Sequence, residues 1–143
     1  MLNKDDLIQY FSDGIKLKGS EKIGTEHEKF IYSKKDLSLI PFHGERSISA
    51  VLKKFIENGW DPIVEDEQIV GANKNQASIT LEPGGQFELS GAPLNNLHET
   101  CREINDHLSF TKSLEEEFDI GFLGIGYIPV SYTHLTLPTI SWV

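Results

Sequence analysis

The strongest constraint on the fold is a strict alternation of apolar and polar residues on both sides of the turn Pro83-Gly84-Gly85. Successive side chains of a β-strand point to opposite faces, so each arm separates its residues into two sets. Glycine permits the positive φ angles that tight turns require. Residues 78–90 therefore predict an antiparallel hairpin with one polar face and one apolar face. The apolar face carries Ile79, Leu81, Phe87 and Leu89.

Glutamates dominate the polar positions of this hairpin and recur in a second predicted strand. Glu82 and Glu88 share the polar face, and a loop centred on Gly85 would place them directly opposite each other. Glu26 and Glu28 are two residues apart, so they also share a face. Adjacent carboxylates repel each other unless a cation lies between them. Magnesium prefers such oxygen ligands and usually shares them with phosphates. The spacing alone also fits a solvated strand and a surface turn.

The remaining pattern predicts an α+β fold. Short strands joined by tight turns pair antiparallel, and helices then cover one face of the sheet. The longest predicted helix has an apolar stripe that includes Cys101 as a small core residue. We expect helices over residues 4–18, 48–57 and 94–118, and strands over residues 21–32, 62–65, 69–72, 78–82, 86–90 and 119–128.

Length and charge exclude several classes of protein. A chain of 143 residues suits one domain. Its net charge of -9 argues against non-specific nucleic-acid binding. Without a 20-residue apolar run or a signal peptide, we expect no membrane partner. The single cysteine excludes an intramolecular disulfide and fits a cytoplasmic location.

The composition changes abruptly near the end of the chain. Residues 130–143 contain no Asp, Glu, Lys or Arg and are rich in Thr and Leu. We interpret residues 1–129 as the N-terminal part of a catalytic domain and residues 130–143 as a non-native tail, which we leave out of the fold prediction. The alternative is an authentic apolar C-terminal segment.

Several segments occur in the order and spacing of a known enzyme family. The most specific are Gly24-Thr25-Glu26-His27-Glu28 and Leu81-Glu82-Pro83-Gly84-Gly85-Gln86-Phe87-Glu88-Leu89-Ser90. Further agreement comes from residues 97–101 and 121–126. Over about residues 5–129, the chain resembles glutamate–cysteine ligase of the plant and proteobacterial type.

This resemblance implies a partial glutamine synthetase-like catalytic domain, with a curved antiparallel sheet that holds substrates and metals. It implies ATP-dependent joining of the L-glutamate γ-carboxylate to the L-cysteine amine through an acyl phosphate, the first step of glutathione synthesis. Small molecules are thus the expected partners. The resemblance also implies that Mg²⁺ is bound by residues matching the acidic strands of the family. These residues are Glu26, Glu28, Glu82 and Glu88.

The sequence departs from the family after Ile128-Pro129, so strands and basic substrate-binding residues of the family are missing. The resemblance therefore implies that the chain alone is inactive, and its catalytic residues stay unassigned. Two alternatives are a ligase with another amine acceptor and a non-catalytic metal- or nucleotide-binding remnant. Beside the glutamates, alternation places His27 on the opposite face, and we expect Lys29 to be solvated.

Overall fold

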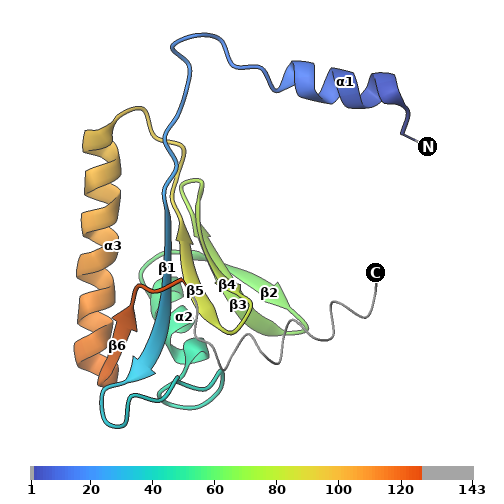
Figure 1. The fold of residues 1–143 in the computed structure, drawn as a ribbon. Helices are drawn as coiled ribbons and strands as arrows, with labels where there is room; N and C mark the ends of the chain where they lie inside the picture. The colour runs from blue at the N-terminus through green and yellow to red at the C-terminus, as the bar shows by residue number, and fades with distance from the viewer. Residues whose placement is uncertain (1, 127–143) are drawn as a thin grey trace.

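A computed structural model describes residues 2–126 and contains one open sheet with the strand order β2-β3-β4-β5-β1-β6 (Figure 1). All neighbouring strands are antiparallel. The predicted α+β class with an antiparallel sheet is therefore confirmed. Residues 130–143 lie outside the described part, so the boundary at residue 129 stays a prediction. In chain order the elements are α1 (Lys4–Asp13), β1 (Glu26–Ser33), α2 (Ile48–Glu57), β2 (Asp61–Glu65), β3 (Gln68–Lys74), β4 (Ala77–Glu82), β5 (Gln86–Ser90), α3 (Leu97–Phe118) and β6 (Ile120–Leu123).

The hairpin β4–β5 forms as predicted, but its register corrects one expectation. Glu82 pairs with Gln86, and Glu88 pairs with Thr80. The prediction that Glu82 lies directly across from Glu88 is therefore wrong. The turn is centred on Gly84 rather than Gly85, because the pairing of Glu82 with Gln86 leaves residues 83–85 as the loop, within which the Gly85 N–H donates to the Glu82 carbonyl at 3.1 Å. A three-residue turn keeps both glutamates on the polar face but offsets them along it.

Helices α2 and α3 cover the apolar face of the sheet. Phe55 of α2 lies 5.6 Å from Phe87 of β5 and 4.8 Å from Phe110 of α3, measured between ring centroids. Ile79 and Leu89 beside Phe87 are almost fully buried. The core thus lies between these two helices and the central strands, which confirms the predicted arrangement of helices on one face.

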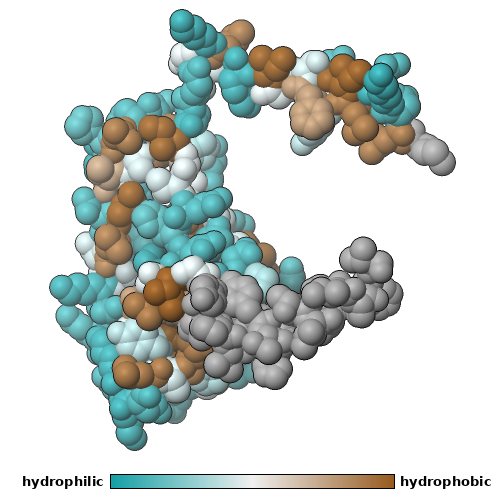
Figure 2. Space-filling model, in the orientation of Figure 1, coloured by the Kyte–Doolittle hydropathy of each residue, from teal (hydrophilic) through white to brown (hydrophobic). Residues whose placement is uncertain are grey.

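Helix α1 lies apart from the sheet (Figure 1). The Asn3 side chain caps its first turn, and the Asp6 carboxylate accepts a hydrogen bond from the backbone N–H of Asn3. This capping box stabilises the helix start, and Gly14 ends the helix earlier than predicted. The helix buries no residue, and its apolar side chains give the brown patches on the upper right arm of Figure 2. Its stability therefore rests on local interactions.

Further details differ from the prediction. Helix α3 begins at Leu97 rather than at residue 94, and β6 ends at Leu123 rather than at residue 128. Strand β1 begins at Glu26 rather than at residue 21, because Ile23 makes only an isolated bridge with Leu94. Cys101 is exposed rather than part of the core. The stripe of α3 that faces the sheet is more polar than the apolar periodicity suggested. Its buried residues are Thr100, His107, Thr111 and Leu114.

Candidate functional site

The register of three adjacent strands places all four predicted glutamates on one face of the sheet. Glu28 of β1 pairs directly with Glu88 of β5, and Glu26 pairs with Ser90. Glu82 of β4 pairs with Gln86, two residues before Glu88 on the same face of β5. We call this surface the acidic face, defined by Glu26, Glu28, Glu82 and Glu88. It lies opposite the face that α2 and α3 cover.

Glu28 and Glu88 form the closest pair in this set. Residues directly opposite in an antiparallel ladder have Cβ atoms about 5 Å apart, a distance at which like charges repel. Gln86 Nε2 donates to Glu28 Oε2 at 3.0 Å, and Ser90 Oγ donates to Glu88 Oε1 at 2.6 Å. Both donors are neutral, and Glu88 is only 9% exposed. Among residues 2–126, the carboxylate pair therefore has hydrogen-bond donors without a compensating positive charge.

The ion pairs of residues 2–126 lie elsewhere, between Lys34 and Glu115, Arg46 and Asp119, and Lys54 and two glutamates. Within this range, no three Asp, Glu, His or Cys side chains converge closely enough to hold a metal ion by themselves. Magnesium commonly takes one or two protein carboxylates and completes its shell with water and phosphate oxygens. Two facing carboxylates match that donor chemistry, and the assignment of all four glutamates as ligands stays a prediction.

An open pocket of about 530 Å³ extends from this region along the edge of the sheet. Residues 26–29 of β1 form one wall, and Gly124, Ile125 and Gly126 form the other. The carbonyl of Ile125 accepts a hydrogen bond from Gln86 Nε2 at 3.2 Å, so Gln86 links this wall to Glu28. The sequence analysis did not assign a role to Gln86. Its position among polar strand residues was the available signal.

The opposite side of β1 carries a buried polar contact. Lys29 is 8% exposed, and its Nζ lies 3.0 Å from His107 Nε2 of α3. The prediction that Lys29 is solvated is therefore wrong, whereas His27 turns away from the acidic face as expected. Strict alternation already indicated this outcome, because Lys29 shares the face of His27.

Burial sets the protonation of this contact. It is the largest cause that lowers the pKa of His107 to about 3, followed by the nearby charges of Lys29 and His27. Burial also lowers the pKa of Lys29. A lysine ammonium has only donors, so His107 Nε2 accepts and the ring hydrogen resides on Nδ1. That Nδ1 has no hydrogen-bond partner among the described residues.

Within residues 2–126, none of the helices has the length and apolar character needed to cross a bilayer. The cytoplasmic location stays a prediction, and the names of the relatives described next place those proteins in the chloroplast.

Comparison with known proteins identifies the family. The chain is 50% identical over 129 residues to glutamate–cysteine ligase of Medicago truncatula, 48% over 128 residues to glutamate–cysteine ligase A of Oryza sativa subsp. japonica, and 46% over 129 residues to glutamate–cysteine ligase of Arabidopsis thaliana. Each alignment covers 90% of this chain but only 24–26% of the relative, so the chain spans about a quarter of their length. The family model "Glutamate-cysteine ligase family 2 (GCS2)" matches residues 22–140. This match includes the whole acidic face, and the chain belongs to glutamate–cysteine ligase family 2.

Proposed function

We propose that the whole protein joins the γ-carboxylate of L-glutamate to the amine of L-cysteine at the expense of ATP, the first step of glutathione synthesis. The acidic face of this chain is the proposed magnesium-binding part of the active site. The observation that carries the proposal is the facing pair Glu28 and Glu88, which has no cationic partner among the described residues. Family membership supplies the reaction class.

The chemistry of the face supports this role. Transfer of a phosphoryl group to a carboxylate concentrates negative charge, and a bound magnesium ion would offset that charge. Glu28 and Glu88 are the residues best placed to hold the ion, with Glu26 and Glu82 at the flanks. Gln86 and Ser90 would keep the carboxylates oriented through the hydrogen bonds they donate. The cysteine amine then forms an amide with the carbon of the γ-carboxylate, and phosphate leaves from the acyl phosphate.

We expect this chain to be inactive by itself. The strand positions of β1, β4 and β5 that belong to the acidic face hold no Lys or Arg. A phosphoryl-transfer site needs positive side chains as well as metal ions to hold nucleotide phosphates. These groups would come from the three quarters of the relatives that the alignment leaves uncovered. An assay for γ-glutamylcysteine with this chain, ATP and magnesium should give no product.

Magnesium binding is testable on the chain itself. We expect MgCl₂ at several times its Kd to raise the free energy of unfolding by about 1 kcal/mol through preferential binding to the folded state. Glu28→Gln and Glu88→Gln should abolish this increase. The control is Glu116→Gln, an exposed carboxylate of α3 away from the acidic face. The measurement is urea denaturation with and without MgCl₂.

Two results would count against the proposal. Equal magnesium stabilisation in Glu28→Gln, Glu88→Gln and the unmodified chain would remove the facing pair from the metal site. Full ATP-dependent ligase activity in a full-length family member with both glutamates replaced would remove the pair from catalysis. Magnesium binding by the chain, together with unimpaired activity of that double variant, would favour the non-catalytic role instead.

A further inference from the structure

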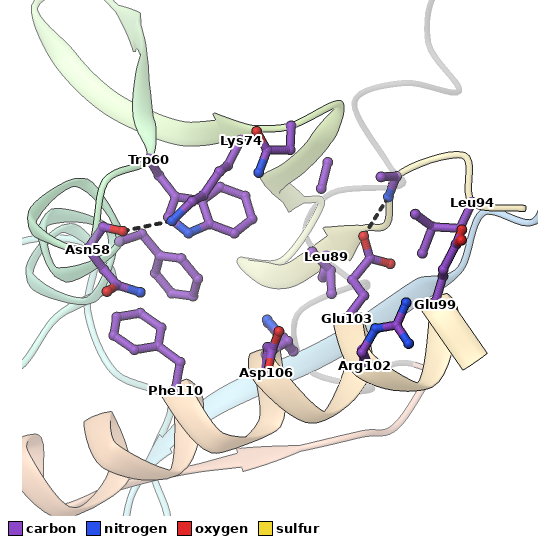
Figure 3. A pocket seen from close by; sticks show the side chains of 15 residues that line it. Asn58, Trp60, Lys74, Leu89, Leu94, Glu99, Arg102, Glu103, Asp106 and Phe110 are labelled. Atoms are coloured by element: carbon purple, nitrogen blue, oxygen red, sulfur yellow. Dashed lines mark hydrogen bonds between the residues drawn. The ribbon is translucent and has the colours of Figure 1, made fainter. Parts of the chain in front are cut away.

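A second pocket lies on the helix-covered side of the sheet, away from the acidic face. Its volume is about 410 Å³, within the range of small-molecule sites. Figure 3 shows it between α3 and a wall that includes Asn58, Trp60 and Lys74. Leu89 of β5 also lines it, and Glu88 next in sequence points to the opposite face. The pocket therefore uses residues different from the proposed metal ligands.

One end of this pocket is aromatic. The ring of Phe55 meets those of Trp60 and Phe110 edge to face, with centroids 5.4 Å and 4.8 Å away. Trp60 and Phe110 are only partly buried, so they present ring surface to the pocket. Aromatic walls of this kind favour a planar apolar group through burial and ring–ring contacts.

The other end carries charged side chains from successive turns of α3. Arg102 and Asp106 are four residues apart, and Figure 3 shows both on the side of the helix that borders the pocket. Neither makes a side-chain hydrogen bond or ion pair with another residue in the range 2–126. Among the other charged residues of the lining, Lys74 Nζ donates to the Asn58 carbonyl, and Glu103 Oε1 accepts from the Ala92 N–H while its buried Oε2 has no partner in residues 2–126. Arg102 and Asp106 thus supply a cation and an anion that are available to a ligand.

A buried donor gives an independent indication of a ligand. His107 lines the pocket, is 7% exposed, and has a ring Nδ1 without a partner in the described part of the chain. The contact with Lys29 fixes the hydrogen on this atom, so it is an unused donor. A buried donor without a partner is unfavourable, and a ligand oxygen at hydrogen-bond distance would satisfy it.

These features together specify one chemical class. We propose that the pocket binds a free aromatic α-amino acid as its zwitterion. Asp106 would receive the ammonium group, Arg102 and the ring N–H of His107 would donate to the carboxylate, and the side-chain ring would pack against Trp60 and Phe110. The carboxylates that line the pocket disfavour an anionic nucleotide or phosphate. This binding does not depend on the proposed ligase function.

Isothermal titration calorimetry with L-phenylalanine, without magnesium or ATP, tests the proposal. Phenethylamine lacks the carboxylate, and 3-phenylpropionate lacks the ammonium group. We expect Asp106→Asn to weaken L-phenylalanine and phenethylamine about tenfold but to leave 3-phenylpropionate unchanged. Arg102→Gln should weaken L-phenylalanine and 3-phenylpropionate and leave phenethylamine unchanged.

The controls are Glu116→Gln and Lys112→Gln, exposed residues of α3 outside the pocket. Circular dichroism should show all four variants folded, because every substituted side chain is exposed. Absence of saturable L-phenylalanine binding at millimolar concentration would overturn the proposal. So would equal weakening by the control and pocket variants. Neither result would alter the magnesium test, which depends on the other face of the sheet.

Discussion

The two faces of the sheet are built from the same strands but differ in chemistry: one is apolar and covered by helices, and the other is acidic. On β5, Phe87 and Leu89 are buried under the helices, whereas Gln86 and Glu88 belong to the acidic face. On β1, Lys29 contacts α3 while Glu28 faces Glu88. The covered face gains its stability from apolar packing. The acidic face instead keeps like charges close together, which opposes folding and favours a bound cation. Removing a side chain from the covered face should therefore lower the free energy of unfolding, whereas removing a charge from the acidic face should raise it.

The largest effect should come from the covered face. Phe87 is fully buried and contacts Phe55 of α2 and Phe122 of β6, so Phe87→Ala leaves a cavity between the sheet and α2. We expect the free energy of unfolding to fall by about 3–5 kcal/mol, measured by urea denaturation. Phe87→Leu is the control and should lose less. A loss below 1 kcal/mol for Phe87→Ala would show that this face is not the stabilising one.

The second effect concerns pH. His107 has a folded-state pKa of about 3 and an ordinary pKa of 6.5. Below pH 6.5 His107 is mostly protonated in the unfolded chain but stays neutral in the folded chain. Acid therefore favours unfolding. Through this group the free energy of unfolding should fall by about 2 kcal/mol between pH 7.5 and pH 5, and it should be nearly constant above that range.

The control for this pH effect is His107→Gln, which removes the titrating group. Its urea denaturation midpoints should decline less steeply between pH 6.5 and pH 5. Identical slopes in both chains would mean that His107 is protonated in the folded state. Its Nε2 could then not accept a hydrogen bond from Lys29.

The third effect concerns the acidic face and should raise the free energy of unfolding rather than lower it. Without magnesium, Glu88→Gln removes the repulsion from Glu28, so we expect the free energy of unfolding to rise by up to about 1 kcal/mol. Glu82→Gln is the matched control, because Glu82 pairs with the neutral Gln86 and should change stability less. A clear loss of stability in Glu88→Gln would mean that the carboxylate pair stabilises the fold.

The smallest effect should come from α1, which contributes to neither face. Phe11 is 74% exposed, so Phe11→Ser should change the free energy of unfolding by no more than about 0.5 kcal/mol. Urea denaturation of this variant beside Phe87→Ala compares an exposed and a buried phenylalanine directly. A loss above 2 kcal/mol would show that α1 packs against another part of the protein in solution.

Much of the fold could be predicted from local pattern. Alternation assigned Glu82, Glu88 and Phe87 to the correct faces. The pairing of Glu28 with Glu88 could not be predicted, because β1 joins β5 across more than 50 residues and nothing local fixes that register. The exposure of Cys101 was missed for a related reason. Buried Thr100 and His107 set the inward stripe of α3, and apolar periodicity does not detect them.

The β4–β5 hairpin should tolerate a change of length in its turn but not in its strands. Directly paired residues stay on one face whatever the loop length, so one residue added to Pro83-Gly84-Gly85 would leave Glu82 paired with Gln86 across a four-residue loop. One residue added within β5, between Phe87 and Glu88, would instead turn Glu88 to the covered face and away from Glu28. We therefore expect length variation at the turn and a fixed spacing between Gln86 and Glu88.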